Sequence, residues 1–138
     1  MITACIITKN AQETLSNTLH NLSFVDEMVV VDDYSEDNTR EVAKTFHARV
    51  YKRHLNADFA GQRNYALSKA KQGWVLFLDA DETLSLPLLD EIKQAISNSL
   101  ARFMRLPKGF SLSFKSIDST NENRKHFKLM RHFKGNKK

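Results

Sequence analysis

The sequence contains one cysteine and four glycines, and it has no long apolar run. Cys5 alone cannot form a disulfide within the chain. The glycines lie too far apart to form a GxGxxG dinucleotide loop or a P-loop, so these two nucleotide-binding signatures are excluded. The apolar runs at 4–7 and 28–31 are far shorter than the roughly 20 residues that a membrane-spanning helix needs. Since the N-terminus also lacks a signal-peptide pattern, the sequence predicts a cytoplasmic protein.

The composition is that of a folded chain with an uneven distribution of charge. Of its 138 residues, 41% are hydrophobic and 27% are charged, which excludes a chain that is disordered throughout. Residues 101–138 hold eleven Lys and Arg against two acids and so carry +9. Residues 1–100 hold ten basic and fourteen acidic side chains and carry −4. The overall charge of +5 therefore conceals two regions of opposite sign.

Residues 1–100 alternate between short β-branched runs and helical patterns. Strands are predicted over 2–8, 27–32, 48–52 and 74–78. The helices between and after them have these predicted signals: N-caps at Asn10, Asp37 and Asp58, a terminating Gly73, and a start near Pro87 with Asp90 and Glu91 in the first turn. This alternation is typical of an α/β fold with a mostly parallel sheet and helices on both faces. Ligands of such sheets bind beyond the carboxyl ends of the strands.

Acidic side chains follow two of the predicted strands at that edge. Asp32 and Asp33 come after the second strand, and Asp79 and Asp81 come after the fourth. Carboxylates gathered at one edge repel one another, and a divalent cation relieves that repulsion. Asp79 and Asp81 can converge on one Mg²⁺ or Mn²⁺, with a diphosphate completing the shell. Two structural alternatives stay open: Asp81 caps a turn, or the 32–33 pair closes its loop as an Asx turn.

Four segments resemble, in order and spacing, the N-terminal half of family 2 glycosyltransferases. They are I-I-T-K-N at 6–10, V-V-V-D-D-Y-S-E-D-N-T at 29–39, Q-R-N-Y-A-L at 62–67 and W-V-L-F-L-D-A-D-E at 74–82. The likeness is strongest to the subgroup that builds bacterial lipopolysaccharide core or related surface glycans. It implies a GT-A, Rossmann-like nucleotide-diphospho-sugar transferase fold. It also implies inverting transfer from a nucleoside diphosphate sugar, expected to be UDP-linked, to a glycan or lipid-linked acceptor.

The same resemblance implies a role for each matching residue. The nucleotide-sugar-binding residues would be Thr8, Asn10, Asp32, Asp33, Ser35, Arg63 and Asp79, and the metal ligands would be Asp81 and Asp79. Within these sets, an acid of the 32–33 pair would hold the base, and Asp81 would ligate the Mg²⁺ or Mn²⁺ that bridges the two phosphates. Residues 1–100 would then form the nucleotide-sugar-binding α/β domain. Residues 101–138 would form a basic extension at the start of the acceptor-side region.

The base for an inverting displacement is not evident from the sequence. Such a reaction needs a carboxylate on the acceptor side to take the hydroxyl proton. Asp118 and Glu122, in a polar and turn-like stretch, are the candidates for this base. The segment 128–133 resembles the strand that precedes the acceptor region in this subgroup, and the chain then stops. We therefore expect a transferase truncated at its C-terminus.

Two alternative functions belong to other classes. The run L-F-L-D-A-D-E-T at 76–83 also matches haloacid dehalogenase-type phosphatases, in which Asp79 would be the nucleophile and Asp81 the acid/base. That fold usually opens with this motif, whereas here three strands precede it. The second alternative is a non-catalytic basic module, with residues 101–138 binding a nucleotide or an anionic surface. Peripheral contact with the anionic inner face of a membrane is expected through this segment, and nucleic acid is not expected as a partner.

Overall fold

The computed structural model describes residues 1–71, 73–102, 111–116 and 125–132. Its elements, in chain order, are β1 (Ile2–Thr8), α1 (Gln12–His20), β2 (Glu27–Asp32), α2 (Thr39–Thr45), β3 (Arg49–Lys52), α3 (Phe59–Lys69), β4 (Gly73–Asp79), α4 (Leu86–Arg102), β5 (Ser111–Ser116) and β6 (Lys125–His132). The strands form one sheet in the order β3-β2-β1-β4-β6-β5. The four strands predicted from the sequence are confirmed, and they run parallel. β6 pairs antiparallel with β4, and β5 pairs antiparallel with β6.

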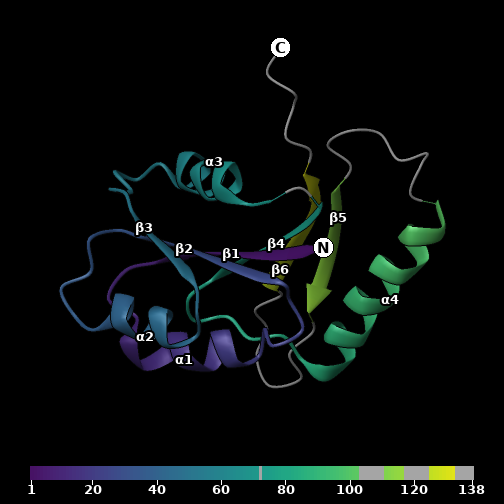
Figure 1. The fold of residues 1–138 in the computed structure, drawn as a ribbon, viewed down its shortest axis with the longest axis horizontal. Coiled ribbons are helices and arrows are strands. Elements are labelled where there is room, and N and C mark those ends of the chain that lie inside the picture. Colours follow the sequence, from purple (N-terminus) through teal and green to yellow (C-terminus); the bar gives the residue numbers. More distant parts are fainter. Residues whose placement is uncertain (72, 103–110, 117–124, 133–138) are drawn as a thin grey trace, which may run out of the picture.

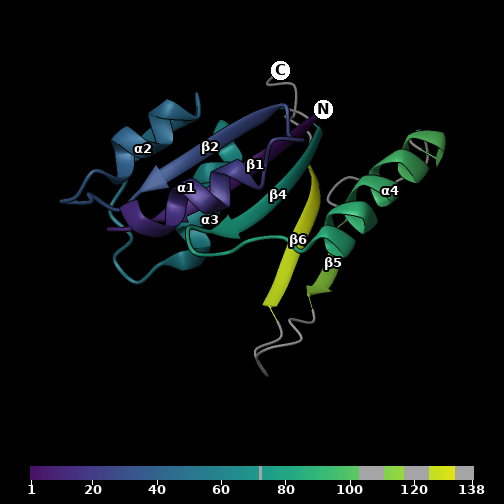
Figure 2. The same cartoon turned by 90° about the horizontal axis from the view of Figure 1, so that it is seen from below.

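Helices cover both faces of the sheet, as the alternating pattern predicts. Figure 1 shows α3 above the sheet and α1 and α2 below it, and Figure 2 shows the strands side by side from below. Side chains of β1 alternate between the two layers: Ala4 and Ile6 pack with α1, α2 and α4, whereas Cys5 packs with α3. We call these the α1 face and the α3 face. Burial of each large aliphatic side chain in these layers contributes about 1.5–3 kcal/mol.

The predicted helix starts are correct at α3 and wrong at α1 and α2. Asp58 caps α3, and its side chain accepts a hydrogen bond from the Gly61 N–H at 2.8 Å. The N-caps of the other two helices are Ala11 and Asn38, without side-chain caps. The reason is that the loops before α1 and α2 bond to each other. Asn10 Oδ1 accepts from the Glu36 N–H at 2.8 Å, and Asp37 Oδ2 accepts from the Gln12 N–H at 3.2 Å.

Two further local predictions are wrong. Helix α3 ends at Lys69, and Gly73 instead opens β4 with a φ of 138°. A Cβ at this position would lie 2.3 Å from the Met1 carbonyl oxygen, so the close approach of β1 and β4 requires glycine here. At α4, the helix begins at Leu86, before Pro87, and its first turn therefore contains no acid. Asp90 and Glu91 lie further along the helix.

The sheet continues past residue 100, where the charge of the sequence changes sign. Residue 100 lies within α4, and β6 extends the sheet by pairing with β4. The division into a domain of residues 1–100 and an extension of 101–138 stays a prediction. Among the helices in the described ranges, none is both long and apolar enough to cross a membrane.

Candidate functional site

The carboxyl ends of β1, β2 and β4 meet at one edge of the sheet. In the parallel pairing, Thr8 lies opposite Asp32, and Ile7 lies opposite Asp79. The sheet thus brings together the acidic segments after β2 and β4, as the sequence predicts. Because successive side chains of a strand point to opposite faces, this edge presents different residues to the α1 face and to the α3 face.

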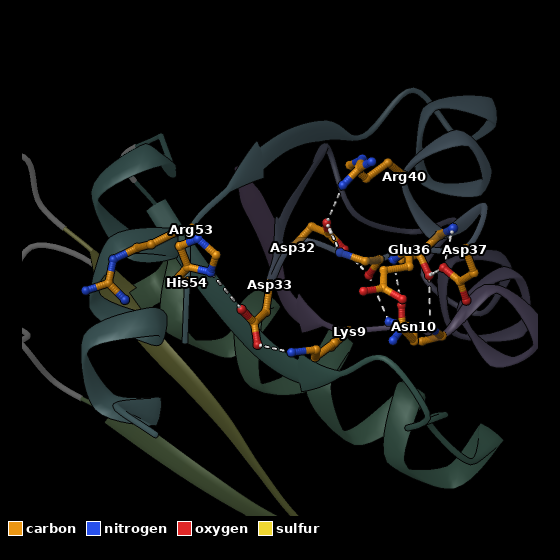
Figure 3. Close-up of polar contacts among 12 residues, drawn as sticks. Lys9, Asn10, Asp32, Asp33, Glu36, Asp37, Arg40, Arg53 and His54 are labelled. Atoms are coloured by element: carbon orange, nitrogen blue, oxygen red, sulfur yellow. Dashed lines mark hydrogen bonds and ion pairs between the residues drawn. The ribbon is translucent and has the colours of Figure 1, made fainter. Parts of the chain in front are cut away.

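Asp32 is fully buried on the α1 face and is held by groups of the protein itself. Its carboxylate accepts hydrogen bonds from the Ser35 N–H at 2.9 Å, from the Ser35 hydroxyl, and from an Arg40 guanidinium nitrogen at 3.1 Å. Figure 3 shows Arg40 reaching this carboxylate from α2. The Ser35 hydroxyl also accepts from the Asn10 N–H at 2.8 Å. Asp32 therefore closes its own loop, as the structural alternative expected, but through an N–H three residues on and not through the two-residue spacing of an Asx turn; this bonding occupies both Asp32 and Ser35.

Asp33 lies beside the open edge and is bonded differently. Its Oδ2 is 3.1 Å from Lys9 Nζ, its Oδ1 accepts from the Leu55 N–H at 3.1 Å, and His54 Nδ1 lies 3.7 Å from Oδ1. Figure 3 shows Lys9 and His54 on opposite sides of this carboxylate. The Leu55 backbone hydrogen bond, with the nearby Lys9 and His54, holds the pKa of Asp33 below its ordinary value. Asp33 is therefore ionised at neutral pH and acts only as a hydrogen-bond acceptor.

Lys9, His54 and Leu55 had no predicted role at this site, and the structure places all three beside Asp33. His54 also stacks on Tyr34, with ring centroids 3.9 Å apart and planes 11° apart. A usable signal was present in the sequence. β3 is parallel to β2, so the residues that follow Lys52 reach the same edge of the sheet. Ligands bind beyond the carboxyl ends of parallel strands, and this holds for the residues after β3 as it does for those after β2 and β4.

Two cavities lie at this edge, one on each face of the sheet. The larger one, of about 600 Å³, is on the α1 side, and its lining includes Asn10, Gln12, Glu13, Asp37 and Asp81. The smaller one, of about 140 Å³, is on the α3 side, and its lining includes Asp33, Leu55, Phe59, Gln62 and Asp79. Residues 7–9 line both cavities. The end of β1 therefore separates two adjoining parts of one crevice.

Thr8 has an unused hydroxyl at the junction of the cavities. The residue is 6% exposed, and its Oγ1 has no hydrogen-bond partner among the described residues. The alternation of β1 puts its side chain on the α1 face, with Ala4 and Ile6. A buried polar group without a partner costs about 1–3 kcal/mol. Such a cost in a cavity wall points to a ligand that completes the hydrogen bond.

The segment after β4 combines a tight turn with two accessible carboxylates. The Asp79 N–H donates to Glu82 Oε2 at 2.8 Å, and the Glu82 N–H donates to the Asp79 carbonyl at 3.1 Å. Arg63 of α3 lies 3.4 Å from Asp79 Oδ1, and the Asp79 side chain is 48% exposed. Asp81 is exposed and lines the larger cavity. Asp79 thus lines the smaller part of the crevice and Asp81 the larger part.

The donor set after β4 fits Mg²⁺ or Mn²⁺ only in part. Carboxylate oxygens suit both metals. Within the described residues, however, no three His, Cys, Asp or Glu side chains gather closely enough to hold a metal ion. Asp79 and Asp81 therefore fit a cation whose remaining ligands come from a bound diphosphate and from water. The candidate bases Asp118 and Glu122 lie outside the described residues.

The comparisons with known sequences identify the family. The model of glycosyl transferase family 2 matches residues 3–137. An uncharacterised glycosyltransferase of Rickettsia typhi is 39% identical over 93 residues, which cover 67% of this chain and 32% of the relative. The lipopolysaccharide core biosynthesis glycosyltransferase LpsC of Rhizobium meliloti is 24% identical over 140 residues, covering 97% of this chain and 52% of LpsC. The chain spans about a third of the length of the first relatives that it matches.

Solved structures confirm the GT-A fold. S. aureus TarS 1–349 in complex with UDP is 25% identical, with a TM-score of 0.60, over 72% of this chain and 32% of that one. The glucosyl-3-phosphoglycerate synthase of Mycobacterium tuberculosis, in complex with Mn²⁺, UDP and glucosyl-3-phosphoglycerate, is 21% identical. Its TM-score is 0.53, over 70% of this chain and 40% of that one. The second likeness concerns the fold alone.

Proposed function

The chain belongs to glycosyl transferase family 2, and from this membership we propose that it binds a UDP-linked sugar and serves its inverting transfer to a glycan or lipid-linked acceptor. UDP in the TarS complex supports the choice of nucleotide. The likeness to LpsC supports a role in lipopolysaccharide or related surface-glycan synthesis. Membership in the family also favours a transferase over the phosphatase that the D-x-D-x-T pattern left open.

The observation that carries this proposal is the bonding of Asp33 beside the smaller cavity. An ionised carboxylate accepts a ring N–H of a base, and the neighbouring Lys9 ammonium donates to a base carbonyl. Leu55 and Phe59 supply apolar surface for the ring in the same cavity. We therefore assign the base to Asp33, which is 9% exposed and lines the cavity, and not to Asp32, which is fully buried in its own loop and lines neither cavity.

The remaining residues of the crevice suit the other parts of the donor. Asp79, half exposed in the smaller cavity, accepts from ribose hydroxyls, and Arg63 contributes positive charge beside it. Asp81, with Asp79, would hold the Mg²⁺ or Mn²⁺. When bound there, the cation supplies charge neutralisation for the departing diphosphate.

The acceptor side of the reaction stays a prediction from the sequence. Inversion needs a base that takes the proton of the acceptor hydroxyl as the glycosyl bond to the diphosphate breaks. Asp118 and Glu122 are the candidates for this base. A cytoplasmic location is proposed on the sequence alone, and peripheral contact with the inner membrane is proposed on the charge of residues 101–138.

Isothermal titration calorimetry tests the proposal directly. With Mn²⁺ present, the folded chain should bind UDP, and Asp33→Asn should weaken binding by about tenfold or more, because the amide cannot replace an ionised acceptor between two donors. Glu41→Gln, which removes one exposed carboxylate on α2, serves as the matched control. A folded chain that binds no UDP, or that hydrolyses a generic phosphoester instead, would contradict the assignment.

A further inference from the structure

The larger cavity is not accounted for by the nucleotide alone. Its volume of about 600 Å³ lies within the range of small-molecule sites. Asp81 lines this cavity, whereas Asp79 lines the smaller one. A diphosphate bound through the proposed cation at these two carboxylates would therefore join a nucleoside on the α3 side to a second group on the α1 side.

Side-chain groups that the local fold does not use in hydrogen bonds supply donors to this cavity. Asn10 Oδ1 accepts from the Glu36 N–H at 2.8 Å, and Gln12 Oε1 accepts from the Asn38 N–H at 2.9 Å. These backbone donors fix both amide groups and leave the two NH₂ groups available to a ligand. The Thr8 hydroxyl, buried and without a partner among the described residues, is on the same face. The three groups match the hydroxyl groups of a sugar.

The charge of the lining excludes one class of sugar. Glu13 and Asp81 are exposed carboxylates that make no ion pair in the described part of the chain, and Asp37 is a third acid in the same wall. Lys9 lines the cavity as well, but its ammonium is paired with Asp33. A cation at Asp81 would be shared with the two phosphates. Glu13 and Asp37 would therefore make the electrostatic potential negative further into the cavity.

We propose that the larger cavity is the subsite for the sugar of the donor and that it selects neutral, hydroxyl-rich sugars over sugars that carry a carboxylate. This inference rests on the proposed function, because it assigns the cavity to the sugar of the same donor. Glu13 in the first turn of α1 is the specificity-determining residue. Its carboxylate accepts hydrogen bonds from sugar hydroxyls and repels an anionic substituent.

Calorimetry with three probes tests the subsite on the chain as it is. UDP, UDP-glucose and UDP-glucuronic acid are titrated with saturating Mn²⁺; the two sugars differ only in a CH₂OH group against a carboxylate. UDP-glucose should bind more tightly than UDP, and at least about tenfold more tightly than UDP-glucuronic acid. Glu13→Gln should bring the ratio of the two sugars toward one and leave the affinity for UDP unchanged. Thr8→Val should reduce the difference by which the affinity for UDP-glucose exceeds the affinity for UDP.

Glu41→Gln makes the same change of charge outside the cavity and should alter none of the three affinities. Binding of UDP with equal affinities for the two sugars would overturn the subsite and leave the proposed function standing. If Glu13→Gln leaves the ratio of the affinities for UDP-glucose and UDP-glucuronic acid unchanged, the role of Glu13 is overturned, and the inference with it. Failure of the folded chain to bind UDP would overturn the proposed function and the subsite together.

Discussion

Asp32 and Asp33 are consecutive, and their carboxylates serve opposite sides of the sheet. The Asp32 carboxylate is buried against Ser35 and lies 3.1 Å from an Arg40 nitrogen, whereas the Asp33 carboxylate lies 3.1 Å from Lys9 at the open crevice. The alternation of side chains along β2 produces this division. One acid of the pair therefore stabilises the loop, and the other is available to a ligand.

The first prediction separates these roles by substitution. Asp32→Asn should lower the free energy of unfolding by about 2–3 kcal/mol, because it removes the charge that faces a partly buried Arg40. Asp33→Asn should lower it by less at neutral pH, because its Lys9 partner is 59% exposed and the amide keeps an oxygen for the Leu55 N–H. Urea denaturation measures both. Equal losses from the two variants would show that the carboxylates share one structural role.

The second prediction compares two buried threonines. Thr18 is fully buried and donates to the Ala80 carbonyl at 2.9 Å, whereas the Thr8 hydroxyl has no partner among the described residues. Thr18→Val should cost about 1–2 kcal/mol of unfolding free energy, because it leaves a carbonyl unsatisfied. Thr8→Val should be neutral or stabilising. Thermal denaturation without ligand provides the comparison, and a large loss for Thr8→Val would contradict an unused hydroxyl.

The sequence was sufficient for those parts of the fold that depend on pattern. Runs of β-branched residues predict β1 to β4 correctly, and the cap at Asp58 is local, since its bond to the Gly61 N–H spans three residues. The starts of α1 and α2 could not be predicted in this way. Asn10 Oδ1 and Asp37 Oδ2 accept hydrogen bonds across two loops that are distant in the sequence, and such contacts carry no local signal. Asp37 Oδ1, by contrast, accepts locally from the Thr39 N–H at 2.9 Å.

The candidate site likewise has a part that the sequence pattern predicts and a part that depends on long-range contacts. Placement of the acids after β2 and β4 at one edge follows from parallel pairing, and the sequence predicted it. The choice of Asp33 over Asp32 needed the direction of each side chain, and the contacts of Lys9 and the Leu55 N–H needed the path of the loop after β3. Their use in binding a nucleotide stays a prediction.

The third prediction concerns acid stability. The pKa of Asp33 is lowered chiefly by the Leu55 N–H, and the pKa of Asp37 is lowered chiefly by the Thr39 hydroxyl. A lowered pKa in the folded state stabilises the protein above the unfolded pKa of about 3.9, and this contribution is lost as pH falls through the folded value. The wild type should therefore lose stability below about pH 4 more steeply than Asp33→Asn. Urea midpoints measured between neutral pH and pH 3 test this, and parallel curves would contradict it.

The fourth prediction concerns the metal. UDP should bind with Mn²⁺ present and much more weakly in EDTA, because the cation would link Asp81 to the phosphates, which the carboxylate would otherwise repel. Asp81→Asn should remove most of the dependence on metal, while Glu41→Gln should retain it. Calorimetry with and without EDTA gives the comparison. Equal affinity in both conditions would exclude a metal bridge at Asp81.

The last prediction follows from the charge of residues 101–138. A segment of +9 next to a region of −4 would direct the crevice toward an anionic surface. Each basic residue near such a surface contributes about 1 kcal/mol, and salt screens it over about 10 Å. Vesicles with anionic lipid should therefore co-sediment the protein at low salt and release it when salt is added.

Substitution tests which residues attach the chain. Lys134, Lys137 and Lys138, which lie outside the described residues, are replaced together by Gln, and the association should weaken. The matched control replaces three exposed lysines of residues 1–100, namely Lys44, Lys71 and Lys93, and should weaken it less because they lie in the acidic region. Equal retention on neutral and anionic vesicles would exclude electrostatic attachment. In that case the proposed acceptor would have to reach the crevice without help from the basic segment.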